Sequence, residues 1–519
     1  MSIGERPRPP GFVNRRQILA AGAGALAAHS LPSLLSPVRA GTPGGRFRLG
    51  MVEGQTTDTL DPQVTNNTFL VHLNLQLRNC LVEIGPDFEA LPELAETFEP
   101  LEGAKKWAFK IRKGVEFHNG KSLSADDVLY SINVHRAESS KSGGKALLKP
   151  VVDIAKDGNA IVFTLDSANA DFPYVLADYH FVIVPEGATD FEKGIGTGGY
   201  TFQEFDPGVR SLVKRNPNYW KADRAHFDEV EMLNIVDPSA RSSALLSGSV
   251  DAIVQADFKT VGRLQQVPDL QLVEVVGTQH ITMPMLVDTA PFDNVDVRLA
   301  IKYAIDREHL VKTVLYGHGV AGNDHPIAPV NRYYAKDIPI RPYDPEKARF
   351  HLKKAGHERL SVQLHASDTI LGLGIDTALL CQSTAAKAGI DIEVVREPAD
   401  GYWDRVWLNK PWYEGFWAGR PTEDWMFTQV YAADASWNEA HWKNERFNVL
   451  LKEARGELDT AKRREMYREM QLLCSDDGGS VIPMFTNVVD AASRKVGFGK
   501  VAANLGGDGA RCSERWWFV

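Results

Sequence analysis

The sequence contains few cysteines and no long apolar run. Four cysteines occur among 519 residues, and Cys80, Cys381, Cys474 and Cys512 form no CxxC pair. Their number and spacing exclude a disulfide scaffold and give no sign of a zinc or thiol redox centre, although a single bridge stays open. No stretch reaches the roughly 18 to 20 apolar residues that a membrane-spanning helix needs.

Sequence motifs of catalysis are absent as well. The chain has no HExxH, GxSxG or GxxxxGK[ST] pattern, and its fourteen histidines are dispersed, with none paired at a metal-site spacing. We interpret His118 and His441 as surface or packed residues. These absences argue against hydrolases and metalloenzymes, so we expect no enzyme activity, no metal and no cofactor. An enzyme with an unrecognised constellation, or a carrier of nickel or haem, is the alternative.

Size and charge set further bounds. A chain with 44% hydrophobic and 24% charged residues can bury a large core, but 519 residues exceed what one core usually serves, so we expect two or three α/β units. Residues 1–40 contain five arginines and one glutamate, so the rest of the chain carries a formal net charge of −13. Such acidity argues against a nucleic-acid partner, because phosphates would be repelled.

The first forty residues have the pattern of an export signal. Arg15 and Arg16 precede a run at 18–28 that is rich in alanine and glycine, and residues 38–40 offer small side chains for cleavage. This looks like a twin-arginine signal. No cysteine lies near the cleavage position, so we expect a periplasmic protein without a lipid anchor. A disordered basic tail is the alternative.

Periodicity predicts alternating strands and helices, with more helices in the second half. Ser124, three residues before Asp127, predicts a helix N-cap, and the Asn-Gly pair within 117–121 is typical of a tight turn. We interpret the charged run at 462–465 as a solvated helix face. The expected strands cover 47–52, 107–111, 160–165 and 200–205, and the expected helices cover 128–134, 297–305, 345–355 and, as one or two helices, 447–474.

A glycine-rich segment at 194–199, Gly-Ile-Gly-Thr-Gly-Gly, fits the dinucleotide-binding pattern GxGxxG. That pattern binds a pyrophosphate only between an apolar strand and a helix. Here a polar segment precedes it, and strand-like alternation at 200–205 follows. We therefore expect the glycines to let a loop pass close to another backbone or a ligand.

Ten short segments then occur in a characteristic order, and the longest reads FKIRKGVEFHNGKSLSADDV. In this order they resemble the dipeptide, oligopeptide and nickel solute-binding proteins of ABC importers, the bacterial extracellular solute-binding protein family 5. The resemblance covers nearly the whole chain after residue 40. The segments are 59–62, 81–83, 91–96, 109–128, 196–200, 215–220, 245–251, 291–298, 304–307 and 343–348.

The resemblance implies an α/β protein with the two-lobed periplasmic-binding-protein fold, of cluster C and similar to type II, with an extra small domain. Lobe I would comprise 41–70, 195–275 and 490–519, the additional domain 71–194, and lobe II 276–489. The lobes would close by a hinge around a small-molecule or peptide ligand.

The resemblance also implies the partners. These are the permease and ATPase complex of an ABC importer in the inner membrane, and we expect a monomer that binds no nucleic acid. A binding protein that presents its ligand to a chemoreceptor, or a chaperone-like peptide binder, remains open.

One position departs from the family pattern. Peptide binders of the family place an aspartate, which pairs with the α-amino group of the ligand, in the segment that corresponds to 416–424. On this register Arg420 takes that position. A guanidinium repels an ammonium group but suits a carboxylate or a phosphate. We hypothesise that Arg420 recognises an anionic group of the ligand; the alternative is that it pairs with Glu423 or Asp424 and holds the loop.

Aromatic residues are dense in the same region, where seven of the eleven tryptophans lie between 403 and 442. Rigid aromatic side chains commonly line ligand pockets. The sequence does not name the ligand: peptides, opine-like or other sugar-phosphate and amino-acid conjugates, and acidic modified peptides stay open. Besides Arg420, the residues that we expect at the ligand are Trp417, Gly419, Trp403, Trp437, Asn438, Gln55, Thr56, Thr57, Thr197, Gly198 and Asp288.

Overall fold

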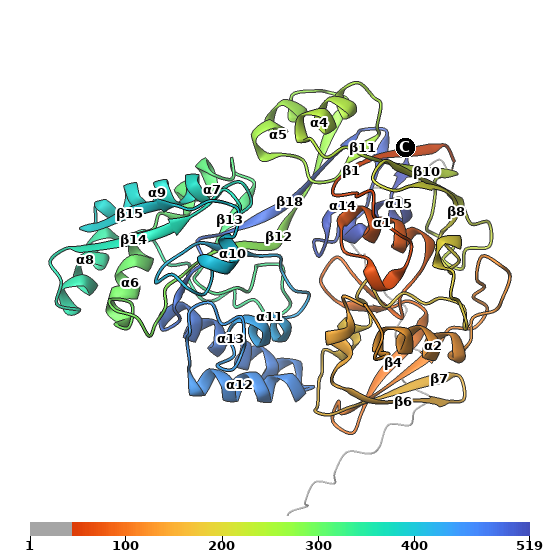
Figure 1. The fold of residues 1–519 in the computed structure, drawn as a ribbon, viewed down its shortest axis with the longest axis horizontal. Helices are drawn as coiled ribbons and strands as arrows, with labels where there is room; N and C mark the ends of the chain where they lie inside the picture. The colour runs from red at the N-terminus through yellow and green to blue at the C-terminus, as the bar shows by residue number, and fades with distance from the viewer. Residues whose placement is uncertain (1–43) are drawn as a thin grey trace, which may run out of the picture. The chain divides into compact units, whose positions relative to one another are not determined.

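The computed structural model describes residues 44–519 (Figure 1), and these residues belong to one compact unit. The expected export signal at 1–40 lies outside the described residues. Among the residues that the structure describes, no helix has both the length and the apolar character needed to cross a membrane.

A ten-stranded mixed sheet is the largest element. Its main path runs β16-β12-β18-β11-β1-β10-β9-β8, with β13 paired to β18 and β17 paired to β12. Strand β1 is parallel to β10 and β11, and the other pairs are antiparallel. The strands are β1 (Arg46–Met51), β8 (Tyr200–Asp206), β9 (Arg210–Arg215), β10 (Glu229–Asn234), β11 (Ala252–Ile253), β12 (Leu270–Pro284), β13 (Gly319–Ala321), β16 (Gly415–Trp417), β17 (Ser480–Val481) and β18 (Met484–Ser493).

Strands β12 and β18 pass from one hydrophobic core to another (Figure 1). They pair antiparallel from Leu270, opposite Ser493, to His280, opposite Phe485. Leu270 packs in a core with helices α4 (Pro238–Leu246) and α5 (Phe258–Gln265), whereas Met283 packs in another with α6 (Val295–Ala304) and α9 (Gly374–Ala386). The same two strands therefore connect separate hydrophobic cores.

A separate four-stranded antiparallel sheet lies within the expected additional domain, in the order β4-β5-β7-β6. The strands are β4 (Ala95–Leu101), β5 (Lys106–Ile111), β6 (Val151–Asp157) and β7 (Ala160–Leu165), and the sheet shares a core with α2 (Ala125–Arg136). Residues alternate between buried and less buried along β7, as a sheet with one covered face requires.

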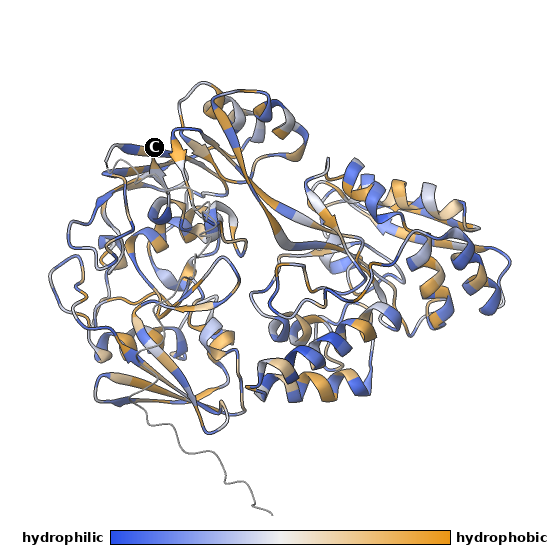
Figure 2. Ribbon diagram, turned by 180° about the vertical axis from the view of Figure 1, so that it is seen from behind, coloured by the Kyte–Doolittle hydropathy of each residue, from blue (hydrophilic) through white to orange (hydrophobic). Residues whose placement is uncertain are grey.

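The expected lobe II contains two cores. One surrounds the parallel pair β14 (Leu360–Ala366) and β15 (Ile390–Arg396), with α6, α8 (Pro345–Lys354) and α9. The other holds α11 (Glu423–Val430), α12 (Glu445–Gly456) and α13 (Thr460–Asp476). Figure 2 colours α12 and α13 with both hydrophilic and hydrophobic residues, as amphipathic helices require.

The other elements lie outside these sheets and helix groups. The helices are α1 (Thr68–Leu77), α3 (Phe172–Val175), α7 (Arg307–Thr313), α10 (Tyr402–Arg405), α14 (Gly506–Ala510) and α15 (Cys512–Arg515), with 3-10 turns at Pro62–Val64, Lys145–Leu148 and Phe191–Lys193. The remaining strands are β2 (Val82–Ile84), β3 (Ala90–Pro92), β19 (Val496–Gly497) and β20 (Trp517–Phe518).

The secondary structure expected from periodicity is confirmed. Each predicted strand agrees with β1, β5, β7 or β8 to within about a residue at its ends, and the segment 447–474 forms two helices, α12 and α13. Helix α2 begins after Ser124 with the expected capping box to Asp127, but it is longer than predicted.

The glycines at 194–199 pack a loop against helix α1. A Cβ at Gly196 would come within 2.2 Å of the Leu77 carbonyl oxygen, and one at Gly198 within 2.3 Å of the Gln76 carbonyl oxygen. Strand β8, rather than a helix, follows. The expected close backbone approach is therefore confirmed.

The interpretation of the charged run at 462–465 as a solvated helix face holds for Lys462, Arg464 and Glu465, which are exposed, but it is wrong for Arg463. Arg463 is 2% exposed, and its guanidinium forms an ion pair with Asp171. The helical pattern could not show this, because Asp171 lies 292 positions away in the sequence.

The disulfide bridge that the cysteine count left open does not form. All four cysteines are buried and free. They lie in four different hydrophobic clusters, so they act as small apolar core residues.

Candidate ligand-binding site

Arg420 lies in the loop between β16 and α11. Strand β16 pairs with β12, which places Trp417 opposite His280. At the other end of the loop, the Thr422 hydroxyl accepts a hydrogen bond from the backbone amide of Trp425 at 3.3 Å and caps α11. A strand and a capped helix therefore hold both ends of this loop.

Two nitrogens of the Arg420 guanidinium are bound locally. Nε donates to Oε1 of Gln429 at 2.7 Å, and Nη1 donates to the carbonyl oxygen of Ala418 at 2.9 Å. The guanidinium carbon lies 5.7 Å from the centroid of the Trp417 ring. Within residues 44–519, Nη2 makes no hydrogen bond and Arg420 forms no ion pair, so donor capacity is left for another acceptor.

The alternative role of Arg420, pairing with its helix neighbours, is not what the structure shows. Oε1 of Glu423 accepts a hydrogen bond from the backbone amide of Tyr333 at 2.7 Å. Asp424 forms an ion pair with Arg455 at 3.1 Å. Both acidic residues of the first turn of α11 thus have partners other than Arg420.

Residues 178 and 179, which are far from Arg420 in the sequence, affect its pKa. Burial lowers the pKa of Arg420, and the acidic groups of Tyr179 and Asp178 act against that shift. Burial also raises the pKa of Tyr179 to about 12, and the charge of Arg420 opposes it. Asn74 of α1 donates to the backbone oxygen of Tyr179 at 2.9 Å and holds this segment. Residues 178–179 of the expected additional domain therefore lie within electrostatic reach of the Arg420 loop.

Indole rings continue outward from Arg420. Trp417 contacts Trp437 with ring centroids 5.6 Å apart, Trp437 meets Trp407 at 6.2 Å, and Trp407 meets Trp403 at 6.3 Å. Trp417 is only 8% exposed, whereas Trp403 and Trp437 remain 40% and 41% exposed. Trp437, one ring contact beyond Trp417, therefore offers flat, partly exposed apolar contact, whereas Trp403 lies three ring contacts beyond Trp417.

A buried carboxyl group holds one of these indoles in place. Oε1 of Glu439 accepts from Nε1 of Trp407 at 2.8 Å, and Oε2 accepts from the hydroxyl of Thr282 at 3.1 Å. Burial raises the pKa of Glu439 to about 7. No sequence motif points to Glu439, because its role depends on a contact with a residue 32 positions earlier.

Two buried histidines have unused ring nitrogens, and one of them, His280, lies within electrostatic reach of Arg420. Nδ1 of His280 lies 3.0 Å from the Thr278 carbonyl oxygen. Nε2 of His280 and both ring nitrogens of His325 have no hydrogen-bond partner among the described residues. Burial lowers the pKa of each histidine to about 4, and the charge of Arg420 adds to this effect at His280. Sequence reasoning missed both, because neither histidine belongs to a motif or pairs with another histidine at a metal-site spacing.

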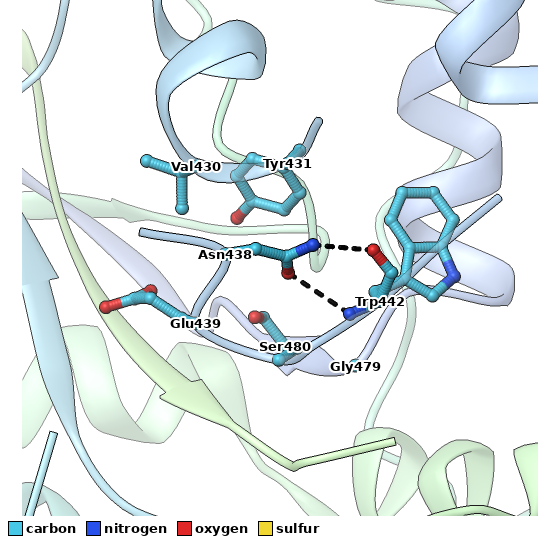
Figure 3. A pocket seen from close by; sticks show the side chains of 8 residues that line it. Val430, Tyr431, Asn438, Glu439, Trp442, Gly479 and Ser480 are labelled. Atoms are coloured by element: carbon cyan, nitrogen blue, oxygen red, sulfur yellow. Dashed lines mark hydrogen bonds between the residues drawn. The ribbon is translucent and has the colours of Figure 1, made fainter. Parts of the chain in front are cut away.

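Gly419 and Asn438 shape the neighbouring loops. A Cβ at Gly419 would come within 1.7 Å of the Thr278 hydroxyl oxygen, so a side chain does not fit there. Figure 3 shows the Asn438 amide donating to the Trp442 carbonyl oxygen at 2.7 Å and accepting from the Trp442 backbone amide at 3.1 Å. The cavity beside Asn438 offers about 10 Å³ to the centre of a water molecule, which is room for one water. Contact of Asn438 with a ligand stays a prediction.

Thr197 and Gly198 are bound to the end of α1. The buried Thr197 hydroxyl donates to Oδ1 of Asn79 at 3.0 Å, and the Gly198 amide donates to the Leu77 carbonyl oxygen at 3.0 Å. These bonds fasten the glycine loop, and a role of either residue at the ligand stays a prediction.

The remaining candidates lie elsewhere. Gln55, Thr56 and Thr57 are exposed in the loop after β1, and Asp288, beyond the end of β12, pairs with His441 at 2.9 Å. The structure thus brings Arg420, Trp417 and Trp437 together, with Gly419 in the same loop and Trp403 at the far end of the indole series. Asn438, Thr197, Gly198 and Asp288 are bonded to other residues of the chain, and Gln55, Thr56 and Thr57 are exposed in a separate loop.

Two lobes are joined by long shared strands, and a guanidinium and several indoles lie beside those strands. This arrangement is that of a protein with the periplasmic-binding-protein fold. The model of the bacterial extracellular solute-binding proteins, family 5 (middle), matches residues 89–439. This chain belongs to that family, as the ten segments predicted.

Relatives and solved structures agree over most of the chain. The dipeptide-binding protein of Escherichia coli (strain K12) is 27% identical over 484 residues, which cover 84% of this chain and 89% of the relative. The glutathione-binding protein GsiB of Pectobacterium atrosepticum is 25% identical over 464 residues, which cover 85% and 89%. The structure of HbpA2 from Haemophilus parasuis shares the fold with a TM-score of 0.82 at 20% identity, covering 92% of this chain and 100% of that one.

Proposed function

We propose that this protein is the periplasmic solute-binding component of an ABC importer, and that it holds a peptide-like, anionic solute between its lobes and delivers it unchanged to the permease. Relatives named for dipeptide and glutathione binding support the peptide-like class. The proposal includes export by the twin-arginine route without a lipid anchor, a monomeric state and no enzyme activity.

The predicted boundaries of the lobes belong to this proposal. Three hydrophobic clusters support part of them, because the cluster of the four-stranded sheet draws its buried residues from 81–183, and the two clusters of the expected lobe II draw theirs from 281–485. The boundary at residue 71 lacks this support, because Leu73 and Leu77 of α1 pack in the cluster of the expected lobe I.

The proposal of an anionic ligand rests on the surroundings of Arg420. Its guanidinium is partly buried, has an indole beside it and has no carboxylate partner within the described residues. A buried cation without a counter-ion is unfavourable, and an anionic ligand would supply the missing charge. Glutathione, which carries two carboxylates, is a suitable first probe, since a relative is named for binding it.

Calorimetric titration of ligand-stripped protein with glutathione and with the neutral-side-chain dipeptide Ala-Ala tests this class. We expect tighter binding of the more anionic probe, and we expect Arg420→Ala to weaken it at least tenfold, because charged hydrogen bonds contribute about 1.5–3 kcal/mol. Arg446→Ala, which removes an exposed guanidinium paired with Glu469, is the matched control. Equal affinity in wild type and Arg420→Ala would remove Arg420 from the site.

A further inference from the structure

A buried ion pair links two segments that the sequence keeps far apart. Nη1 and Nη2 of Arg463 donate to the two carboxylate oxygens of Asp171 at 2.9 and 2.6 Å. Asp171 is 4% exposed and Arg463 is 2% exposed. Asp171 belongs to the expected additional domain and Arg463 to helix α13 of the expected lobe II, so a fork-to-fork pair, a strong type of side-chain contact, joins the two lobes.

Further polar contacts surround this ion pair. The backbone amide of Ala170 donates to the carbonyl oxygen of Arg455 at 2.7 Å. Nη1 of Arg332 donates to the hydroxyl oxygen of Tyr174 at 2.5 Å, and its guanidinium carbon lies 5.5 Å from the Tyr174 ring centroid. The contact therefore connects residues 170–174 with α12, α13 and the segment around Arg332.

The guanidinium of Arg463 and the backbone of Asp171 are each held by contacts on their own side. Nε of Arg463 donates to the Ala454 carbonyl oxygen at 2.8 Å, and its guanidinium carbon lies 5.3 Å from the Tyr333 ring centroid. On the other side, the Asp171 amide donates to Oδ1 of Asn169 at 2.9 Å. Preorganised partners lose little conformational freedom when they meet.

No shared apolar core binds the two sides together. In the described part of the chain, the hydrophobic cluster of the additional domain and the cluster of α12 and α13 have no residue in common. Interfaces between domains that move are polar and limited, whereas permanent ones are large and apolar. This contact can therefore open without dividing a hydrophobic cluster, and both charges then regain water.

We propose that Asp171 and Arg463, with Tyr174 and Arg332, form a rim latch that closes the lobes independently of the Arg420 loop. The latch raises the closed fraction of the ligand-free protein. Because apparent affinity scales with the competent fraction, the latch also strengthens capture of any solute that the closed state holds. The inference rests on the proposed lobes, but it does not depend on the identity of the solute.

Distance measurements between spin labels test the latch without any ligand. All native cysteines are buried, so labels are directed to Val152→Cys on β6 and Val449→Cys on α12, whose side chains are 58% and 42% exposed in the wild type. We expect Asp171→Asn to raise the open population of the stripped protein by about tenfold or more, because the closed state then buries an unpaired guanidinium. A longer label distance and a larger radius of gyration in solution scattering should result.

Two further variants keep the test decisive. Arg468→Gln on the same helix removes an ion pair with Asp337 that lies within lobe II, so it should leave the distance distribution unchanged. Tyr174→Phe removes the hydroxyl that Arg332 contacts and keeps the ring, and it should shift the distribution in the same direction as Asp171→Asn but less. Should Asp171→Asn fail to fold, Tyr174→Phe decides. The proposal would be overturned if every folded latch variant showed the same label distances as the wild type. This conclusion would hold whether or not those variants bind glutathione.

Discussion

Arg420 and Glu439 show how far single positions can be interpreted from sequence. The resemblance placed Arg420 at the position of the family's aspartate, and this substitution predicted an anionic ligand. Its surroundings could not be predicted, because the partners of Glu423 and Asp424 come from segments 90 and 31 positions away. Glu439 carried no signal at all, since a lone glutamate after an asparagine has no characteristic spacing.

At this residue scale, Glu439 gives a pH-dependent prediction. Its pKa is about 7 in the folded protein against about 4.5 ordinarily, so the folded state binds the proton more tightly. Its contribution to stability is fully present below pH 4.5 and is lost as the pH rises to about 7. The Glu439→Gln variant has no carboxyl group at this position and does not suffer this loss. The difference in free energy of unfolding between the variant and wild type should therefore be more favourable to the variant at pH 8 than at pH 4.5, by up to about 3 kcal/mol.

Thermal unfolding of both proteins at pH 4.5 and pH 8 measures this effect. The difference in Tm between Glu439→Gln and wild type should be more positive at pH 8. A difference that does not change with pH would show that the Glu439 carboxyl ionises as freely as it does in the unfolded chain.

At the scale of elements, local signals predicted local structure and failed where a distant segment decides burial. Strand alternation and the capping box at Ser124 depend on near neighbours, so β7 and the start of α2 could be placed from sequence. The charged run on α13 could not be resolved, because only the folded chain brings Asp171 to Arg463. For the same reason, the sequence could not show that Nη2 of Arg420 has no hydrogen-bond partner among the described residues.

The capping box of α2 gives the prediction at this scale. The Asp127 carboxylate accepts hydrogen bonds from the Ser124 backbone amide at 2.9 Å and from its hydroxyl at 2.7 Å. Ser124→Ala removes the second bond and should lower the free energy of unfolding by about 1 kcal/mol. The exposed Ser122, two residues earlier, offers Ser122→Ala as the control, with an expected change below about 0.5 kcal/mol in denaturant unfolding. Equal effects of the two variants would contradict a stabilising role for the cap.

At the scale of the whole molecule, the two-lobed fold followed from ten ordered segments rather than from composition. The segments could not predict which surfaces of the two lobes contact each other, because a family pattern reflects the shared fold and not the ligand pocket. The structure adds two connections between distant segments: the reach of residues 178–179 to the Arg420 loop, and the rim latch at Asp171 and Arg463.

The central claim, that a solute is held between the two lobes at Arg420, is tested most directly by hydrogen exchange. The solute that co-purifies is identified by mass spectrometry, removed, and added back to the stripped protein. We predict slower amide exchange in two separate peptides, one covering 418–430 in lobe II and one covering 178–183 in the additional domain, because a solute between the lobes contacts both sides. Slower exchange in only one of them, or in neither while the solute is bound, would contradict the account.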